Sequence, residues 1–336
     1  MPNMPDRKIN QSDIARQADV SISTVSRALS GAPGIRPELR ERIMSIAYSL
    51  GYDHPAGNDA QRVAVILPMN PVTGGLHQIF QETFDGFQAA ALESGLRLFP
   101  HLIMERDVTA AQLREIHDSI GSTTTVIFYA RPDAELMQYL RQTGPFVQVF
   151  NRDGEMRFDA VMADDRAGAR LMVRHILGLG HRKTAFVFAP SRPSSQRRQQ
   201  GMHEALADVP DASATLIALD HDRQETAFDY FTALFAKGRP DWSVAICVND
   251  LVAMGLIQAA RDAGLSVPGD LSVSGFDSLA WSQMTKPSLT TMHVDRAALG
   301  REVANALLRR LADPAAPVLT VMQGSTLLPG GTVTAI

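Results

Sequence analysis

The sequence contains one cysteine, Cys247, in 336 residues, and this scarcity excludes several kinds of protein. A single thiol builds neither a disulfide framework within the chain nor a zinc site made of several cysteines. Cys247 lies in the apolar run SVAICVND, so we interpret it as a small buried residue and not as a reactive thiol. A chain without disulfides is typical of a reducing cytosol.

Long hydrophobic runs are also missing. No uncharged apolar stretch approaches the roughly 18 residues that a membrane-spanning helix needs. The N-terminal segment MPNMPDRKINQSDIARQ lacks the apolar centre of a signal peptide. We therefore expect a cytoplasmic protein without membrane contact, and the length predicts two or three structural units.

The chain has no excess of positive charge. Its formal net charge is −4, so it is not a basic protein that coats nucleic acid as a whole. The first 57 residues carry seven basic and six acidic side chains. Any contact with DNA must therefore depend on the placement of side chains, and on dimerisation, more than on bulk charge.

Two patterns divide the chain at a short polar segment. Residues 9–52 contain three short helical patterns, and residues 53–61 (DHPAGNDAQ) have the Pro, Gly and Asn of a linker. From residue 62, short apolar runs alternate with amphipathic stretches, which is the pattern of β-α-β units around mostly parallel sheets. We predict a helical head at 1–52, a linker at 53–61 and an α/β domain at 62–336.

Two short helices separated by a three-residue turn are predicted in the head. Asn10 is placed to cap the first helix, with Asp13 three residues later as in a capping box. Asp19 stands in the turn, where we expect a left-handed backbone. Ser21 is placed to cap the second helix, and a third helix is predicted over residues 37–50.

This pattern is typical of a helix-turn-helix, whose second helix enters the major groove of DNA. The polar side of the second helix carries Ser23, Ser26 and Arg27. Small side chains let a helix approach base edges, and a guanidinium group reaches guanine or phosphate. A three-helix bundle with a solvated polar face has the same helix count, so the count alone leaves both interpretations open.

A longer string separates these alternatives. IARQADVSISTVSRALSGAPGIRPELRERIMSIAYSLGY contains A-x-x-A-x-V-S-x-x-T-V-S-R followed by R-x-R-I-x-x-x-A-x-x-L-G-Y. It resembles the DNA-binding head of the LacI/GalR family of bacterial regulators. The resemblance implies that Ile22 and Ser23 read bases at the start of the recognition helix. The expected DNA-binding residues are Asn10, Ser21, Ile22, Ser23, Thr24, Ser26 and Arg27.

The linker departs from the family pattern. The family usually continues after Gly-Tyr with P-N-x-x-A-R-x-L, a hinge helix that wedges leucine into the minor groove. Here the sequence continues DHPAGNDAQRVAVILP, and Pro55 and Gly57 disfavour a helix. We therefore predict no ordered hinge helix within residues 53–61.

The resemblance continues through nearly the whole chain, most closely from Asp164 and from Ala245. It implies an α + α/β fold: the helical head, then a periplasmic-binding-protein-like (type I) core of two doubly wound α/β subdomains joined by three crossing strands. We place subdomain one at about 62–160 plus 291–318, and subdomain two at about 161–290 plus 319–336. The resemblance also implies a homodimer and an effector bound between the subdomains.

Polar side chains follow several predicted strands, at the end of a parallel sheet where ligands bind. Such groups suit the hydroxyls of a sugar or polyol. The candidate effector-binding residues are Asn151, Arg152, Arg198, Asp222, Asn249 and Asp277. The resemblance implies this role for Arg152, Arg198, Asn249 and Asp277, and Asp222 stands where the family often has a stacking aromatic. Alternatively, Asn249 and Asp250 cap a helix that starts at residue 251.

Other classes of protein are disfavoured. The sequence has no G-x-G-x-x-G, phosphate loop or H-E-x-x-H, and no nucleophile elbow accompanies His175, His181 and Asp164. A periplasmic carrier has no use for a helix-turn-helix. We expect no catalysis, no cofactor and no metal. The chain is predicted to be a transcription regulator, in the first place a repressor, that binds double-stranded operator DNA. A small polar ligand is expected to control its affinity for the operator.

Overall fold

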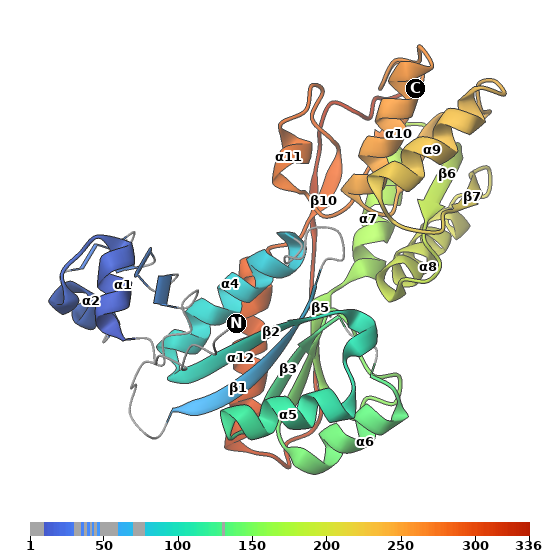
Figure 1. Cartoon of the computed structure of the whole chain (residues 1–336). Coiled ribbons are helices and arrows are strands. Elements are labelled where there is room, and N and C mark those ends of the chain that lie inside the picture. The colour runs from blue at the N-terminus through green and yellow to red at the C-terminus, as the bar shows by residue number, and fades with distance from the viewer. Residues whose placement is uncertain are drawn as a thin grey trace, which may run out of the picture. The chain divides into compact units, whose positions relative to one another are not determined.

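The computed structural model describes residues 10–29, 60–69, 78–129 and 132–336, together with 35–36, 39–40, 42–43 and 46–47 (Figure 1). The chain divides into two compact units, residues 1–61 and residues 62–336. None of the described helices is long and apolar enough to cross a membrane.

Helices α1 (Gln11–Ala18) and α2 (Ile22–Leu29) of the first unit begin directly after the predicted caps Asn10 and Ser21. Asn10 Oδ1 accepts hydrogen bonds from the N–H groups of Ser12 and Asp13, at 3.0 and 3.2 Å, and Asp13 accepts one from Asn10 N–H. Asp19 has φ 52° and ψ 51°, in the left-handed region. The predicted capping box and left-handed turn are confirmed.

The third segment of the head is fastened to the ends of the first two helices. Its described residues 39–40, 42–43 and 46–47 are helical. Arg40 donates to the carbonyl of Ala28 at 3.1 Å, and Arg42 donates to the carbonyl of Ala18. Carbonyls at a helix C-terminus have no partner within the helix, so these arginines satisfy them. A small apolar core lies between the segments and contains Ile14, Ala15, Ala18, Val25, Ala28, Ile43 and Ala47.

The linker prediction falls almost wholly outside the described residues. Residues 51–59 are not described, and β1 begins at Gln61. The expected absence of a hinge helix within residues 53–61 therefore stays a prediction.

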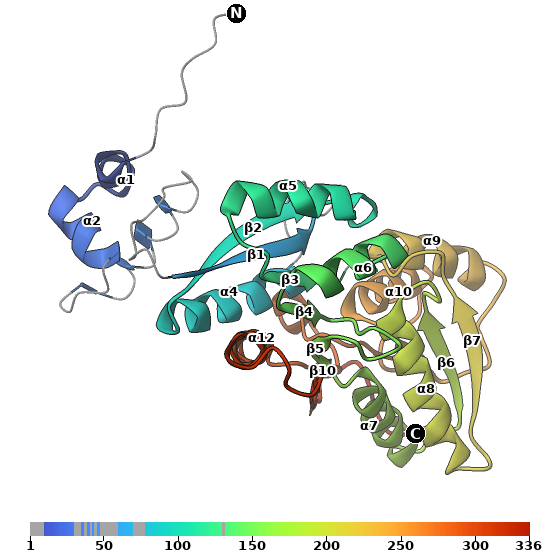
Figure 2. The same cartoon turned by 90° about the horizontal axis from the view of Figure 1, so that it is seen from below.

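The first sheet of the second unit has six strands in the order β11-β5-β4-β3-β1-β2. These are β1 (Gln61–Pro68), β2 (Leu96–Ile103), β3 (Thr125–Phe128), β4 (Phe146–Val149), β5 (Asp159–Ala163) and β11 (Thr320–Gln323). Helices α4 (Gln78–Glu93) and α12 (Arg296–Ala312) cover one face, and α5 (Ala110–Ile120) and α6 (Ala134–Thr143) cover the other (Figure 2). Alternate residues of β1 explain this: Val63 and Val65 pack in the α4/α12 core, and Ala64 and Ile66 in the α5/α6 core.

Two glycines let α4 and α12 approach closely. A Cβ at Gly300 of α12 would lie 2.2 Å from the carbonyl oxygen of Thr83, and one at Gly86 of α4 would lie 2.3 Å from that of Ala297. No other residue fits either position without moving the backbones apart.

The second sheet has four parallel strands in the order β7-β6-β8-β9. They are β6 (Lys183–Phe188), β7 (Ser213–Ala218), β8 (Val244–Cys247) and β9 (Ser272–Ser274). Helix α7 (Asp165–Gly178) packs on α8 (Pro193–Ala207), and α9 (Gln224–Phe235) packs on α10 (Asp250–Asp262). Cys247 is buried in β8, and burial raises the pKa of its thiol, as expected for a structural cysteine.

The chain crosses between the two sheets three times, but not at the predicted boundaries. Strand β5 pairs in the first sheet up to Ala163. Strand β10 (Thr291–His293) pairs with β12 (Thr326–Leu328) and is bridged to the second sheet through Asp277 and His293. Strand β11 pairs with β5, because β5 offers a free parallel edge. The assignments of residues 291–293 to subdomain one and of 320–323 to subdomain two were therefore wrong.

Candidate DNA-reading helix and effector cleft

Helix α2 carries most of the predicted DNA-binding side chains on the surface of the head. Ser23, Ser26 and Arg27 are exposed, and Ile22 keeps 51 % of its surface accessible. Ser21 Oγ accepts the N–H of Thr24 at 3.1 Å, so Ser21 caps α2 as predicted. All these side chains come from one short stretch, so local helix geometry alone brings them together.

Arg198 is the centre of a buried polar cluster in the second unit. It lies in the second turn of α8 and is 8 % exposed. Its Nε donates to Asp165 at 2.8 Å, one terminal nitrogen donates to the carbonyl of Val248, and the other donates to Asp277 at 3.2 Å. The guanidinium carbon lies 3.7 Å from the ring centre of Phe276. Every nitrogen of this guanidinium therefore already has a partner in the protein.

Asp277 joins the cluster to the crossing strands. Its φ is 109°, and its carboxylate is buried between Arg198 and Arg296. Arg296, at the start of α12, also donates to the Asp277 carbonyl at 2.6 Å and to Glu82 of α4 at 3.1 Å. Burial raises the pKa of Asp277, whereas the two arginines oppose that rise. The cluster thus extends from the second sheet to helices of the first.

Asn249 and Asp222 lie side by side at the edge of this cluster. Asn249 Oδ1 accepts the N–H of Val252 at 2.8 Å, so Asn249 caps α10. Its amide nitrogen donates to the carbonyl of Asp222 at 3.1 Å. The Asp222 carboxylate lies 3.5 Å from Nε of Arg192.

Asp250 does not cap α10, contrary to the capping alternative. The helix starts at Asp250, one residue earlier than predicted, so this side chain lies inside the first turn. Its carboxylate accepts from Leu279 N–H, Ser282 Oγ and Thr291 Oγ1, at 2.8, 2.7 and 2.6 Å. Burial, together with the charge of Asp277, raises the pKa of Asp250 to about 6.

Asn151 and Arg152 follow β4, apart from the other four candidates. Asn151 Oδ1 accepts the N–H of Arg152 at 2.9 Å, and the Arg152 side chain is exposed. Among the residues that the structure describes, neither side chain forms a hydrogen bond or ion pair with Arg198, Asn249 or Asp277. The structure therefore brings four of the six candidates together as two contacting pairs, Arg198 with Asp277 and Asn249 with Asp222, and leaves Asn151 and Arg152 after β4.

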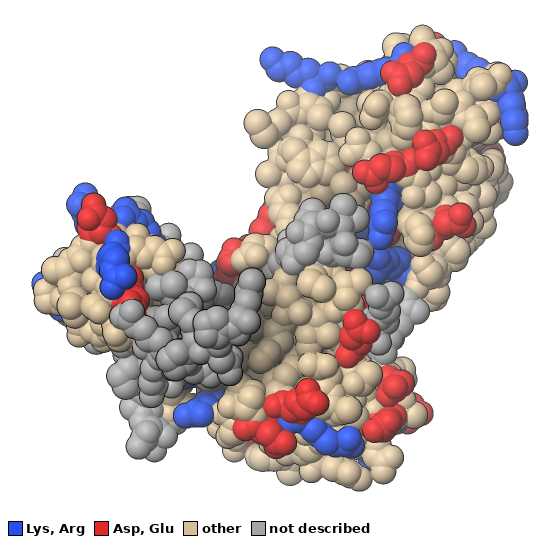
Figure 3. Space-filling model, viewed as in Figure 1, with Lys and Arg blue, Asp and Glu red and all other residues tan. Residues whose placement is uncertain are grey.

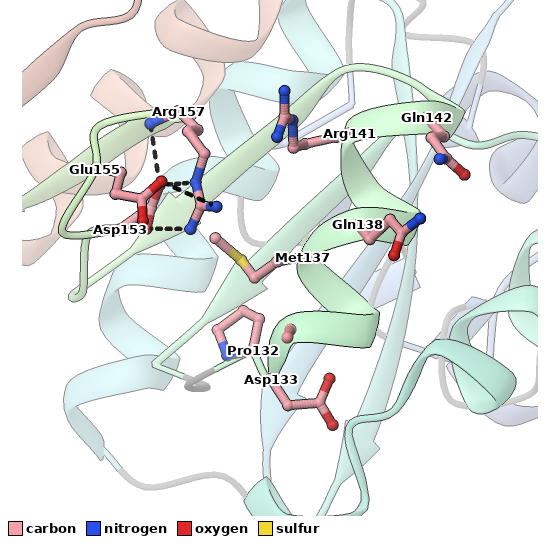
Figure 4. Close-up of a pocket in the computed structure, with 10 residues that line it drawn as sticks. Pro132, Asp133, Met137, Gln138, Arg141, Gln142, Asp153, Glu155 and Arg157 are labelled. Carbon is pink, nitrogen blue, oxygen red and sulfur yellow. Dashed lines mark hydrogen bonds and ion pairs between the residues drawn. The ribbon is translucent and has the colours of Figure 1, made fainter.

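The loop after Arg152 is held by a local ion pair. Arg157 donates to both oxygens of Asp153, at 2.7 and 2.9 Å, and these bonds lower the pKa of Asp153 to about 2. A groove of about 800 Å³ lies between this loop and α6, and Figure 4 shows Met137 of α6 directed toward Arg157. None of the six candidate residues lines this groove, so it is distinct from the Arg198 cluster.

Sequence reasoning missed charged residues that complete the cluster. Asp165, the first residue of α7, accepts hydrogen bonds from both Arg197 and Arg198. Arg192 lies near Asp222, and Arg296 near Asp277. Basic and acidic side chains are visible together between the two subdomains in Figure 3. The sequence did offer one signal for these residues, which is their position. Asp165, Arg192 and Arg296 each stand in or just before the first turn of a helix that follows a strand.

The described residues contain no group of three His, Cys, Asp or Glu side chains placed to hold a metal ion. What the two units do contain is a helix-turn-helix and a core of two parallel α/β sheets with a polar cluster at their strand ends. These features together define a DNA-binding regulator with a ligand-binding core.

Known proteins share both features. The family described as bacterial regulatory proteins, lacI family, matches residues 11–55, and the periplasmic binding protein-like domain matches residues 173–333. The HTH-type transcriptional regulator MalR of Streptomyces coelicolor is 30 % identical over 320 residues, which cover 91 % of each chain.

Solved structures agree. The complex of the transcriptional regulator CelR with cellobiose has a TM-score of 0.72 at 21 % identity, covering 96 % of this chain and 99 % of that one. The lac repressor dimer bound to operator and the anti-inducer ONPF has a TM-score of 0.72 at 21 % identity, covering 98 % and 100 %. The chain belongs to the LacI/GalR family of bacterial transcriptional regulators, and the predicted fold class is confirmed.

Proposed function

We propose that this regulator is a cytoplasmic repressor that binds operator DNA as a homodimer and changes its operator affinity when a sugar or polyol binds between its subdomains. The observation that carries the proposal is the exposed face of α2, with Ile22, Ser23, Ser26 and Arg27 on a head of this family. Catalysis, a cofactor and a membrane have no part in this function.

The chemistry of α2 suits base reading in the major groove. Arg27 reaches guanine O6 and N7 or a phosphate, and Ser23 and Ser26 are small enough to let the helix approach. Ile22 is half exposed and contributes little to the core of the head, so its apolar surface is available for a thymine methyl group. Ser21, Thr24 and Asn10 at the helix ends contact phosphates.

A homodimer follows from the weak charge of one head. A nearly neutral head gains little from phosphate attraction alone, so two heads on a palindromic operator supply the affinity. The lac repressor bound to operator is likewise a dimer.

The polar cluster suits an uncharged ligand with several hydroxyls. Arg198 and Asp277 already neutralise each other, so a neutral ligand adds no unbalanced charge to the buried site. Asp222 and Asn249 at its edge, and Asn151 and Arg152 after β4, complete the proposed set of effector contacts.

Operator fragments and candidate ligands test this function together. Genomic DNA fragments, beginning with those beside the gene, are used in a gel shift with the full chain, alone and with neutral sugars, sugar acids and sugar phosphates. We expect one fragment to be retained and one neutral ligand to change its retention. Asp277→Asn should abolish this ligand response and keep operator binding, since a ligand shifts an equilibrium only through differential affinity. Retention of no fragment at low salt would refute the regulator, and a response to anionic ligands alone would refute the ligand class.

A further inference from the structure

Arg192 contacts both subdomains at a point away from the crossing strands. It immediately precedes α8, in the second subdomain, and its Nε lies 3.5 Å from Asp222 of the same subdomain. On the other side, a terminal nitrogen lies 3.8 Å from Glu105, which follows β2. Its guanidinium carbon lies 5.1 Å from the ring centre of Tyr129, which follows β3.

Two other arginines also contact both subdomains. Arg197 of α8 donates to the carbonyl of Phe150, which follows β4, at 3.4 Å. Arg296 bridges Glu82 and Asp277, but it stands three residues after β10 and therefore beside a crossing strand. A rotation about the crossing strands moves atoms beside them only slightly. The partners of Arg192, which are Asp222, Glu105 and Tyr129, lie outside those strands, so a rotation that opens the two subdomains would separate it from Glu105 and Tyr129.

The partners of Arg192 combine fixed and adjustable groups. The Tyr129 ring is 8 % exposed, packs 5.8 Å from Phe80 and offers a rigid platform for the guanidinium. The Asp222 backbone is held by Asn249. The two ion pairs are long, and the Glu105 and Asp222 side chains remain 40 % and 26 % exposed. Such pairs are weak enough to break and form again.

We propose that Arg192 is a reversible latch, which holds the two subdomains closed through Glu105 and Tyr129 while Asp222 keeps it in place. The latch is a property of the chain without ligand, so it goes beyond the proposed function and is testable without an operator or an effector. Closure of two α/β subdomains about a hinge is a common motion, and a side-chain contact across the open side biases its equilibrium.

Spin labels on the two subdomains measure this closure. Gln138→Cys on α6 and Gln200→Cys on α8 introduce exposed thiols, whereas the native Cys247 is buried and does not compete for the label. Pulsed electron paramagnetic resonance then gives the distribution of distances between the labels in the full chain. Excess unlabelled chain removes distances between protomers.

We expect Arg192→Ala to broaden the distribution and shift it to longer distances. Glu105→Gln and Tyr129→Ala should do so in part, whereas Tyr129→Phe keeps the ring and should match the wild type. Arg174→Ala is the matched control, because it removes an exposed ion pair with Asp208 within the second subdomain. Circular dichroism confirms folding, and Arg192→Gln, which removes the charge but keeps a polar side chain, serves if the alanine variant is unstable. A distribution for folded Arg192→Ala or Arg192→Gln identical to that of Arg174→Ala would overturn the latch.

Discussion

The reading helix of the head and the Arg198 cluster of the core arrange their candidate functional side chains in opposite ways. On α2, Ser23, Ser26 and Arg27 are exposed, and the hydroxyl of the capping Ser21 bonds to Ser23 and Thr24, within three residues along the chain. In the core, Arg198 is buried and bonds to residues 33 and 79 positions away. A substitution on α2 should therefore change recognition alone, whereas one in the cluster should change stability and ligand response together.

The largest expected effect is a loss of stability when the buried Arg198 is removed. Arg198→Ala leaves Asp165 without one of its two arginines and Asp277 with only the more distant Arg296, and breaking a buried ion pair costs about 3–5 kcal/mol. We expect a loss of that order in the free energy of unfolding of the core, measured by urea denaturation. Arg174→Ala, which removes an exposed pair with Asp208, should cost no more than about 1 kcal/mol. If the two variants lost equal free energy of unfolding, the buried cluster would contribute no more to stability than an exposed ion pair does.

The next largest effect is a loss of operator affinity when the exposed Arg27 is removed. Arg27→Ala should weaken specific operator binding by about 1–3 kcal/mol if the guanidinium reads guanine. The thermal unfolding of the head should stay unchanged, because Arg27 is exposed. Arg16→Ala on α1 is the control, since its side chain is 71 % exposed and pairs locally with Asp13. Unchanged affinity of Arg27→Ala in a gel shift at fixed salt would contradict its assignment.

A smaller effect is expected at Asn10, which should contribute both to the stability of the head and to DNA binding. Asn10 caps α1 and is also expected to contact DNA. Asn10→Ala should lower the stability of the head by about 1 kcal/mol, the usual cost of a lost N-cap. Asn10→Ser retains a capping oxygen and should restore most of that stability. If Asn10→Ser also restores operator affinity, the role of Asn10 is capping, and a persistent affinity loss supports a DNA contact.

The smallest effect concerns the pH dependence of Asp250. Its pKa of about 6 lies above the ordinary value of 3.8. Between these two pH values, Asp250 therefore carries a proton in the folded chain and has lost it in the unfolded chain. The contribution of Asp250 to stability should therefore decrease as the pH rises toward 6 and level off above 7. Relative to Asp250→Asn, the change between about pH 5.5 and 7.5 should stay below about 1 kcal/mol. Urea denaturation of both proteins across this range measures it, and a stability difference that grows with pH has the wrong sign.

Local features of this protein were predictable from neighbouring residues. The caps at Asn10 and Ser21 and the turn at Asp19 each involve atoms within a few positions along the chain, so short patterns are enough to recognise them. The alternation of apolar runs with amphipathic stretches predicted β-α-β units around parallel sheets for a similar reason, whereas the two subdomains were implied by the family resemblance. Each strand or helix carries its own periodicity.

Contacts between distant segments were decided only by the tertiary structure. The partners of Asp250 are 29, 32 and 41 residues away, and nothing in its own segment distinguishes it from Asn249 as a cap. The placement of β11 beside β5 joins positions about 160 residues apart. The same holds for Arg192, whose partners come from both subdomains. A buried charge takes whichever partner the packed sheets bring within reach, so its role depends on the meeting of elements far apart in the chain.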